Sequence, residues 1–179
     1  MSKLGKKIIS LPKDSNIKVE SGGLLVSGPK GSQKININDK LFSSKTNDKN
    51  EFQITPNKKT KNISILWGTY RSLINNAVKG VSAGHEKILE LSGVGFRANL
   101  KGDLLNLQLG FSHDINFKIP KEIKITVEKQ TVIKINGVDK ELVSKIAADL
   151  KSLKPIEPYK AKGIKERGQF VLRKEGKKK

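Results

Sequence analysis

The amino-acid sequence predicts an α+β fold of two tandem homologous domains, each a small, mostly antiparallel sheet packed on one helix, plus a basic extended C-terminal tail. Three patterns predict it: apolar residues that alternate with polar ones, two stretches with apolar residues at helical spacing, and a repeated order of these patterns. A chain of 179 residues is long enough for two such domains. We expect the domains over residues 1–82 and 83–158 and the tail over residues 159–179.

Alternation with period two, which marks half-buried strands, is clearest in the second half of the chain. Residues 94–100 and 105–111 alternate on either side of a short turn that contains Gly102, so they predict a hairpin. Further strands are expected at residues 115–119, 123–127 and 133–135. In the first half, strands are expected in "LLVSG" and around the pairs Ile35 and Ile37, and Phe52 and Ile54. The polar stretch "SSKTNDKNE", around Asp48, is interpreted as an exposed loop.

Each half ends in a stretch with helical spacing of apolar residues. The first stripe consists of Ile63, Leu66, Trp67, Tyr70, Leu73, Ile74, Ala77, Val78 and Val81. The second consists of Leu142, Val143, Ile146, Ala147 and Leu150, and Pro155 ends it. Gly68 lies inside the first helix, where a glycine costs about 1 kcal/mol relative to alanine. It indicates close packing beside Arg71, and we favour packing within the chain over an RNA contact.

The two halves also share a longer pattern. "GGLLVSGPKGSQKINI" in the first half parallels "GDLLNLQLGFSHDINF" in the second, and each is followed by further strand and then by one helix. This order predicts an internal duplication of one domain of about 75–80 residues.

Positive charge is the strongest compositional signal. Lys and Arg number 36 against 17 acidic residues, which gives a formal net charge of +19. Residues 1–82 hold 15 basic and 5 acidic side chains, residues 83–158 hold 12 and 10, and residues 159–179 hold 9 and 2. The expected partner is a polyanion, nucleic acid before an anionic membrane. Because 32 of the basic residues are Lys, we expect recognition mainly of backbone phosphates and shape.

Two motifs resemble enzyme sites, but the structure predicted around each of them does not suit cofactor binding or catalysis. "SGVGFRA" has a G-x-G pattern, but it opens a predicted strand and not the helix that a dinucleotide site requires. Ser112, His113 and Asp114 are consecutive and cannot form a hydrogen-bonded triad among themselves. The absence of Cys excludes disulfides and thiolate metal sites, and no apolar run reaches the roughly 18 residues of a membrane span. We expect no enzyme, cofactor, metal, small-molecule substrate or membrane role.

Two stretches favour nucleic-acid binding to different degrees. "GPKGSQK" contains a G-x-x-G loop that can lie against phosphates, but a tight turn with an exposed Lys30 explains it equally well. The stretch from residue 157 onward cannot bury enough to fold alone, and Pro155 and Pro158 hold it extended. There an aromatic residue stands beside closely spaced lysines and a glycine, as in sites that stack bases and neutralise phosphates: Tyr159, Lys160, Lys162, Gly163 and Lys165. Two of only four Arg residues, Arg167 and Arg173, follow them, and we expect both to belong to the same RNA-binding set.

The C-terminal stretch "EPYKAKGIK", followed by "VLRKEGKKK", is similar to a known signature. It resembles the C-terminal signature of the family of the sixth protein of the bacterial large ribosomal subunit. "LPKDSNIKV", "VSGPKGS", "WGTYRSLINNAVKGV", "LELSGVGFRANL" and "LGFSHDI" occur in the family's order, so the resemblance covers essentially the whole chain. Ala161 stands where the family commonly has Gly, and Lys165 where it commonly has Arg.

The resemblance implies two tandem α+β domains and a cytoplasmic protein of the large ribosomal subunit. It also implies binding to 23S rRNA near the sarcin–ricin loop and the base of the factor-binding stalk, with other subunit proteins and translation factors nearby. Carried over residue by residue, it assigns RNA contact to Tyr159, Lys160, Lys162, Gly163, Arg173, Lys174 and Lys177. A general basic RNA chaperone without a fixed site is the alternative.

Overall fold

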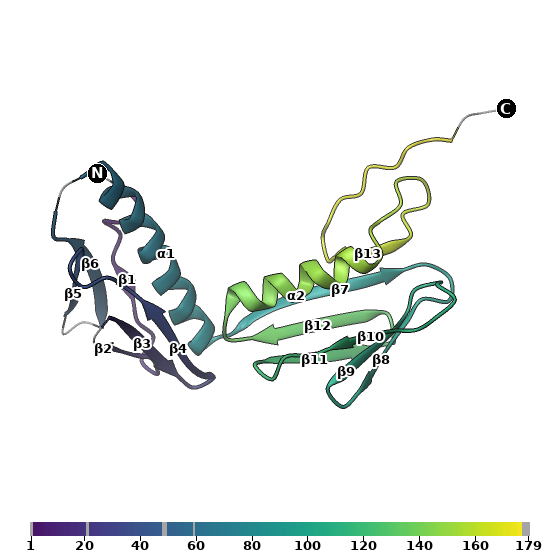
Figure 1. Cartoon of the computed structure of the whole chain (residues 1–179), viewed down its shortest axis with the longest axis horizontal. Coiled ribbons are helices and arrows are strands. Elements are labelled where there is room, and N and C mark those ends of the chain that lie inside the picture. The colour runs from purple at the N-terminus through teal and green to yellow at the C-terminus, as the bar shows by residue number, and fades with distance from the viewer. Residues whose placement is uncertain (1, 21, 48–49, 59, 177–179) are drawn as a thin grey trace. The chain divides into compact units, whose positions relative to one another are not determined.

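The computed structural model describes residues 2–20, 22–47, 50–58 and 60–176, which form two compact units. One unit comprises Met1–His85 with Val138–Lys140, and the other comprises Glu86–Gly137 with Glu141–Lys179 (Figure 1). The described residues of the expected tail, 159–176, therefore belong to the second unit.

In its described residues, the first unit has six strands followed by one helix (Figure 1). Its elements are β1 (Ile9–Ser10), β2 (Asn16–Glu20), β3 (Gly23–Gly28), β4 (Gly31–Asn36), β5 (Phe42–Asn47), β6 (Glu51–Pro56) and α1 (Lys61–Ser82). The strands form two antiparallel sheets, in the orders β2-β3-β4 and β1-β6-β5.

The second unit repeats this plan and adds one strand (Figure 1). Its elements are β7 (His85–Ser92), β8 (Arg97–Lys101), β9 (Leu104–Gln108), β10 (Ile115–Lys118), β11 (Ile123–Glu128), β12 (Val132–Gly137), α2 (Lys140–Leu153) and β13 (Gly163–Glu166). The sheets have the orders β8-β9-β10 and β11-β12-β7-β13.

The two units correspond element by element, which confirms the predicted duplication. The meander β2-β3-β4 matches β8-β9-β10, and the sheet β1-β6-β5 matches β7-β12-β11. In both units the helix follows the last strand of this series. The second unit differs by β13, which lies on the other edge of β7.

The helices form where the apolar stripes predict them, and each stripe lies in the core of its unit. In α1, Trp67 is buried and its Nε1 donates to the carbonyl of Ile54 at 2.7 Å. Two residues of the predicted stripe, Leu66 and Leu73, are instead partly exposed. In α2 the buried residues are Val143, Ile146, Ala147 and Leu150.

The first helix also confirms the packing inferred at Gly68. A Cβ built on Gly68 would lie 3.0 Å from Oγ of Ser2, so the N-terminal segment runs close to the helix there. Nearby, Nε of Arg71 donates to the carbonyl of Lys7 at 3.3 Å. The glycine therefore admits the chain's own N-terminal segment.

Two local predictions are wrong. Residues 43–47 of the supposed exposed loop belong to β5, which pairs with β6 along its whole length; its polar side chains hide the strand pattern. Val94 is 92% exposed and precedes the hairpin, which begins at Arg97. The cause lies in the backbone, because Gly93 and Gly95 both have positive φ and make a turn between β7 and β8.

Candidate nucleic-acid interface

The segment after α2 folds back on itself before it reaches β13. The amide of Glu157 donates to the carbonyl of Lys162 at 2.8 Å, and the amide of Ala161 donates to the carbonyl of Glu157 at 3.0 Å. The amide of Ile164 then donates to the carbonyl of Lys154 at 3.0 Å. These bonds close a loop over residues 157–162, the turn loop, in which Tyr159 and Lys160 stand at the tip of the turn.

β13 anchors this loop to the sheet. It pairs antiparallel with β7, so that Lys165 lies opposite Glu90 and Ile164 opposite Leu91. Ile164 is 1% exposed and joins the core of the second unit. The interpretation of residues 159–179 as a tail without a fold is therefore wrong for 163–166: the strand needs little apolar content of its own because β7 supplies its partner.

Gly163 begins this strand under tight steric limits. Its φ is +141°, and a Cβ built on it would lie 2.7 Å from the carbonyl oxygen of Pro155 and 2.8 Å from Cα of Ile156. Contacts this short with backbone atoms exclude any side chain. Gly163 is buried, so its part in the interface is to let the chain pass close to residues 155–156.

One face of β13 is held by Glu90. Its Oε2 lies 3.3 Å from Nζ of Lys165, and its Oε1 accepts from Nε of Arg167 at 3.0 Å. The hydrogen bond from Arg167, followed by that from Lys165, lowers the pKa of Glu90 below its ordinary value. Lys165 and Arg167, which belong to the predicted RNA-binding set, thus form ion pairs within the second unit.

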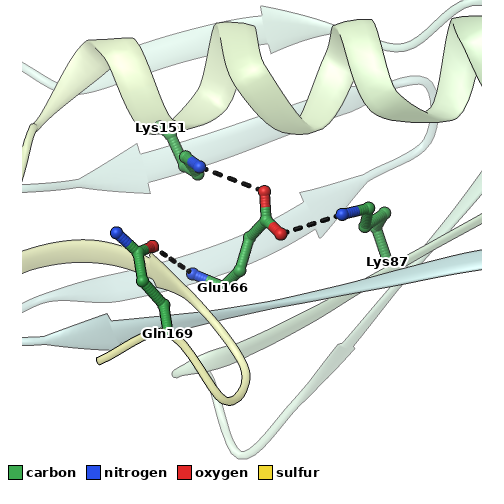
Figure 2. Close-up of polar contacts among 4 residues, drawn as sticks. All are labelled: Lys87, Lys151, Glu166 and Gln169. Atoms are coloured by element: carbon green, nitrogen blue, oxygen red, sulfur yellow. Dashed lines mark hydrogen bonds and ion pairs between the residues drawn. The ribbon is translucent and has the colours of Figure 1, made fainter. Parts of the chain in front are cut away.

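The opposite face of β13 carries Glu166, which Figure 2 shows between two lysines. Its Oε2 accepts from Nζ of Lys87 on β7 at 2.8 Å, and its Oε1 accepts from Nζ of Lys151 on α2 at 3.0 Å. Its amide donates to Oε1 of Gln169 at 3.2 Å. The bond from Lys87, followed by that from Lys151, lowers the pKa of Glu166. Glu166 therefore joins the sheet, the helix and the last strand.

These two carboxylates predict that β13 loosens in acid. Because both pKa values are lowered in the fold, their stabilisation is complete above the ordinary value of 4.5 and is lost as pH falls through the folded values. We expect the amide of Arg167, which donates to the carbonyl of Ile88, to lose protection from hydrogen exchange below about pH 4.5. The double variant Glu90→Gln, Glu166→Gln should show a flat profile; an equally steep decline would contradict this assignment.

After β13 the chain returns to the turn loop. The amide of Gln169 donates to the carbonyl of Glu166, and the amide of Lys174 donates to the carbonyl of Pro158 at 3.0 Å. This bond brings two parts of the predicted RNA-binding set together at exposed positions: Tyr159, Lys160 and Lys162 from the loop, and Arg173 and Lys174 from the returning segment. We call these five residues the basic cluster. Lys177 lies outside the described residues.

The charges of the basic cluster have no acidic counterpart in the described part of the chain. None of its four cations forms an ion pair there, whereas Lys165 and Arg167 both pair with Glu90. Tyr159 is 54% exposed beside them. An exposed ring among unpaired cations suits base stacking combined with phosphate neutralisation.

Ala161 holds the turn loop in a backbone conformation that favours glycine. Its φ is +54°, in the left-handed region. We expect Ala161→Gly to raise the free energy of unfolding by about 0.5–1 kcal/mol, since it removes the Cβ penalty but adds freedom to the unfolded chain. Urea unfolding followed by circular dichroism checks this. The matched variant Ala148→Gly, at an exposed position within α2, should instead lose about 1 kcal/mol; equal effects would contradict the explanation.

The glycine-rich stretch "GPKGSQK" could be either a phosphate-binding loop or a tight turn, and its contacts favour a turn. Gly28 and Gly31 end and begin the paired strands β3 and β4. The amide of Lys30 donates to the carbonyl of Val81 at 3.0 Å, and its Nζ contacts the carbonyl of Ala83. Lys30 thus binds the end of α1.

A second exposed aromatic residue, Phe111, is not among the site residues predicted from the sequence. Phe111 was interpreted as the end of an alternating strand, but β9 ends at Gln108 and Phe111 is 45% exposed. Nζ of Lys154 lies 4.3 Å from the centroid of its ring. The signal available beforehand was Gly110, whose φ of +73° turns the chain out of the strand.

Among the residues that the structure describes, no group of three or more acidic or His side chains is arranged to hold a metal ion. No helix of the described ranges is both long and apolar enough to cross a membrane.

Comparison with known proteins gives one consistent match. The family model described as "Ribosomal protein L6" matches residues 11–84 and again residues 92–167. The chain is 42% identical over 179 residues to large ribosomal subunit protein uL6 of Novosphingobium aromaticivorans, with full coverage of both chains. It is 45% identical over 177 residues to that of Staphylococcus carnosus, covering 99% of this chain and 98% of the relative. Two tandem matches and full-length relatives show that this chain belongs to the ribosomal protein L6 family.

Proposed function

We propose that this chain is a structural constituent of the large ribosomal subunit that binds 23S rRNA through the basic cluster of its second unit. Family membership supports the first part, because the full-length relatives are named as proteins of that subunit. On the same ground the chain is a ribosomal protein and not an enzyme. Its partners are then rRNA and other proteins of the subunit.

One observation carries the RNA-binding part: the hydrogen bond from Lys174 to Pro158 joins the returning segment to the turn loop. Without this contact, cations more than ten positions apart in the sequence would move independently. With it, they form a surface of fixed spacing before RNA arrives. Such preorganisation lowers the conformational entropy that binding must remove.

The predicted site residues divide into two roles. Tyr159 stacks on a base, and Lys160, Lys162, Arg173 and Lys174 neutralise phosphates. The remaining predicted residues with described structure position the cluster: Gly163, Lys165 and Arg167. The division follows from exposure and pairing, since Gly163 is buried and the other two bind Glu90.

The location on the subunit is the finer part of the proposal. We place the site near the sarcin–ricin loop and the base of the stalk, where the protein supports the docking of translation factors. The similarity of "EPYKAKGIK" and "VLRKEGKKK" to the family's C-terminal signature supports this location. The domains at residues 1–82 and 83–158 then serve as two supports, with the residues from 159 onward as the contact.

Competition for 23S rRNA tests the proposal against the general RNA chaperone. The full chain is bound to 23S rRNA at about 0.1 M salt, and transfer RNA or duplex DNA is added in excess. A fixed site predicts that these competitors remove little of the bound protein, since specific sites exceed non-specific binding by about 10³-fold or more. Displacement of most of the bound protein by this excess would favour the chaperone.

A further inference from the structure

We propose that a pocket beside the basic cluster takes one unpaired nucleobase of the bound RNA. The pocket is an open depression of about 530 Å³ in the second unit, within the size range of small-molecule sites. It lies where the β9–β10 loop meets the end of α2 and the turn loop, and Phe111, Lys154 and Lys162 are among its lining residues. The inference rests on the proposed function, because RNA brings the base.

The walls of the pocket suit a flat aromatic ligand. Phe96, Leu109 and Leu153 line it from three separate segments of the chain; Phe96 and Leu109 are buried and back the pocket from the core. Phe111 adds a ring that is nearly half exposed, and the ring of His113 lies 6.2 Å from it at an interplanar angle of 23°. An exposed aromatic ring on a loop gives the fold little stabilisation, but it offers a face on which a base can stack.

Gly110 keeps this space open. A Cβ built on it would lie 3.2 Å from Cε1 of Phe96, inside the pocket that both residues line. Its φ of +73° also directs the chain from β9 into the loop that carries Phe111. A larger residue at this position would strain the loop and narrow the cavity.

The charges at the pocket select a nucleotide over an uncharged aromatic ligand. Lys154 lies over the Phe111 ring, and Lys162 belongs to the basic cluster, so ammonium groups stand beside the apolar walls. A nucleotide satisfies both features, with its base on the ring and its phosphate at the lysines. Glu157 also lines the pocket and is exposed; its carboxylate can only accept hydrogen bonds. It can therefore accept from a donor on the edge of the bound base, either an exocyclic amino group or a ring N–H.

Chemical probing of 23S rRNA with Phe111 variants tests the inference. Hydroxyl radicals report contact with the RNA backbone, and base-specific reagents for all four bases report access to base edges. With the unmodified chain we expect one unpaired base inside the backbone footprint to be protected. Phe111→Ala should expose this base and weaken binding about 5- to 150-fold, while the backbone footprint persists at saturating protein. Phe111→Tyr keeps a ring and should restore base protection.

The other possible results of the probing experiment distinguish failure of this inference from failure of the proposed function. A backbone footprint without any base whose protection depends on Phe111 overturns the inference. No backbone footprint with the unmodified chain overturns the proposed function itself. Because Phe111 is outside the buried core, the variants keep the fold, which circular dichroism verifies.

Discussion

Gly163→Ala is expected to detach β13 from the sheet. The new Cβ meets the backbone of residues 155–156 at 2.7–2.8 Å, and φ at +141° adds strain for any residue with a side chain. Together these costs amount to about 2–4 kcal/mol, which is comparable to what one short strand contributes. Hydrogen exchange at the amides of Ile164 and Arg167 should accelerate strongly, because both donate to carbonyls outside the strand. Affinity for 23S rRNA should fall with it.

Gly168→Ala is the matched control. Gly168 also has positive φ, +83°, but nothing lies within 4 Å of a Cβ built there. Only the conformational penalty of about 1 kcal/mol then applies, and β13 should stay docked. If the amide of Ile164 is equally protected from hydrogen exchange in both variants, the close approach at Gly163 is not what anchors the strand.

Removing three charges from the basic cluster should flatten the salt dependence of RNA binding. If the intact chain neutralises about five phosphates, its affinity should fall about 500-fold between 50 and 200 mM salt, scaled from duplex DNA. The triple variant Lys160→Gln, Lys162→Gln, Lys174→Gln retains about two contacts, so its affinity should fall only about 12-fold over the same range. Filter binding or fluorescence titration at several salt concentrations measures both slopes.

A second triple variant with the same change in net charge separates local contact from overall attraction. Lys118, Lys121 and Lys124 are exposed and lie on or between β10 and β11, and β11 forms the sheet edge opposite β13. Replacing them with Gln should leave the salt slope close to that of the intact chain. Equal flattening by the two variants would mean that total charge, and not the cluster, governs binding.

Elements with strong apolar periodicity could be predicted from the sequence, and elements that depend on a distant partner could not. Both helices and the strands around Ile125 and Ile133 follow from spacing alone, because their own side chains form the core. β13 carries one core residue, Ile164, between glycine and charged residues. Its strand conformation comes from the free edge of β7, which exists only after the second unit has folded.

The candidate site shows the same division. Composition and spacing predict Tyr159 and its neighbouring lysines as candidate site residues, because the charge and the aromatic ring follow from residue type alone. They could not separate Lys160 from Lys165, since only the pairing register places Lys165 opposite Glu90. The pocket at Phe111 forms only where separate segments of the chain meet, so no local sequence pattern predicts it.

Footprinting of 23S rRNA with the intact chain and the cluster variant tests most directly whether the folded C-terminal segment makes the RNA contact. The variant carries Gln at residues 160, 162 and 174, outside β13, so the docked strand and the core remain. We predict that the intact chain protects one defined RNA region and that the variant, at concentrations giving equal total binding, loses part of that protection. Identical protection patterns for the two proteins would contradict the account.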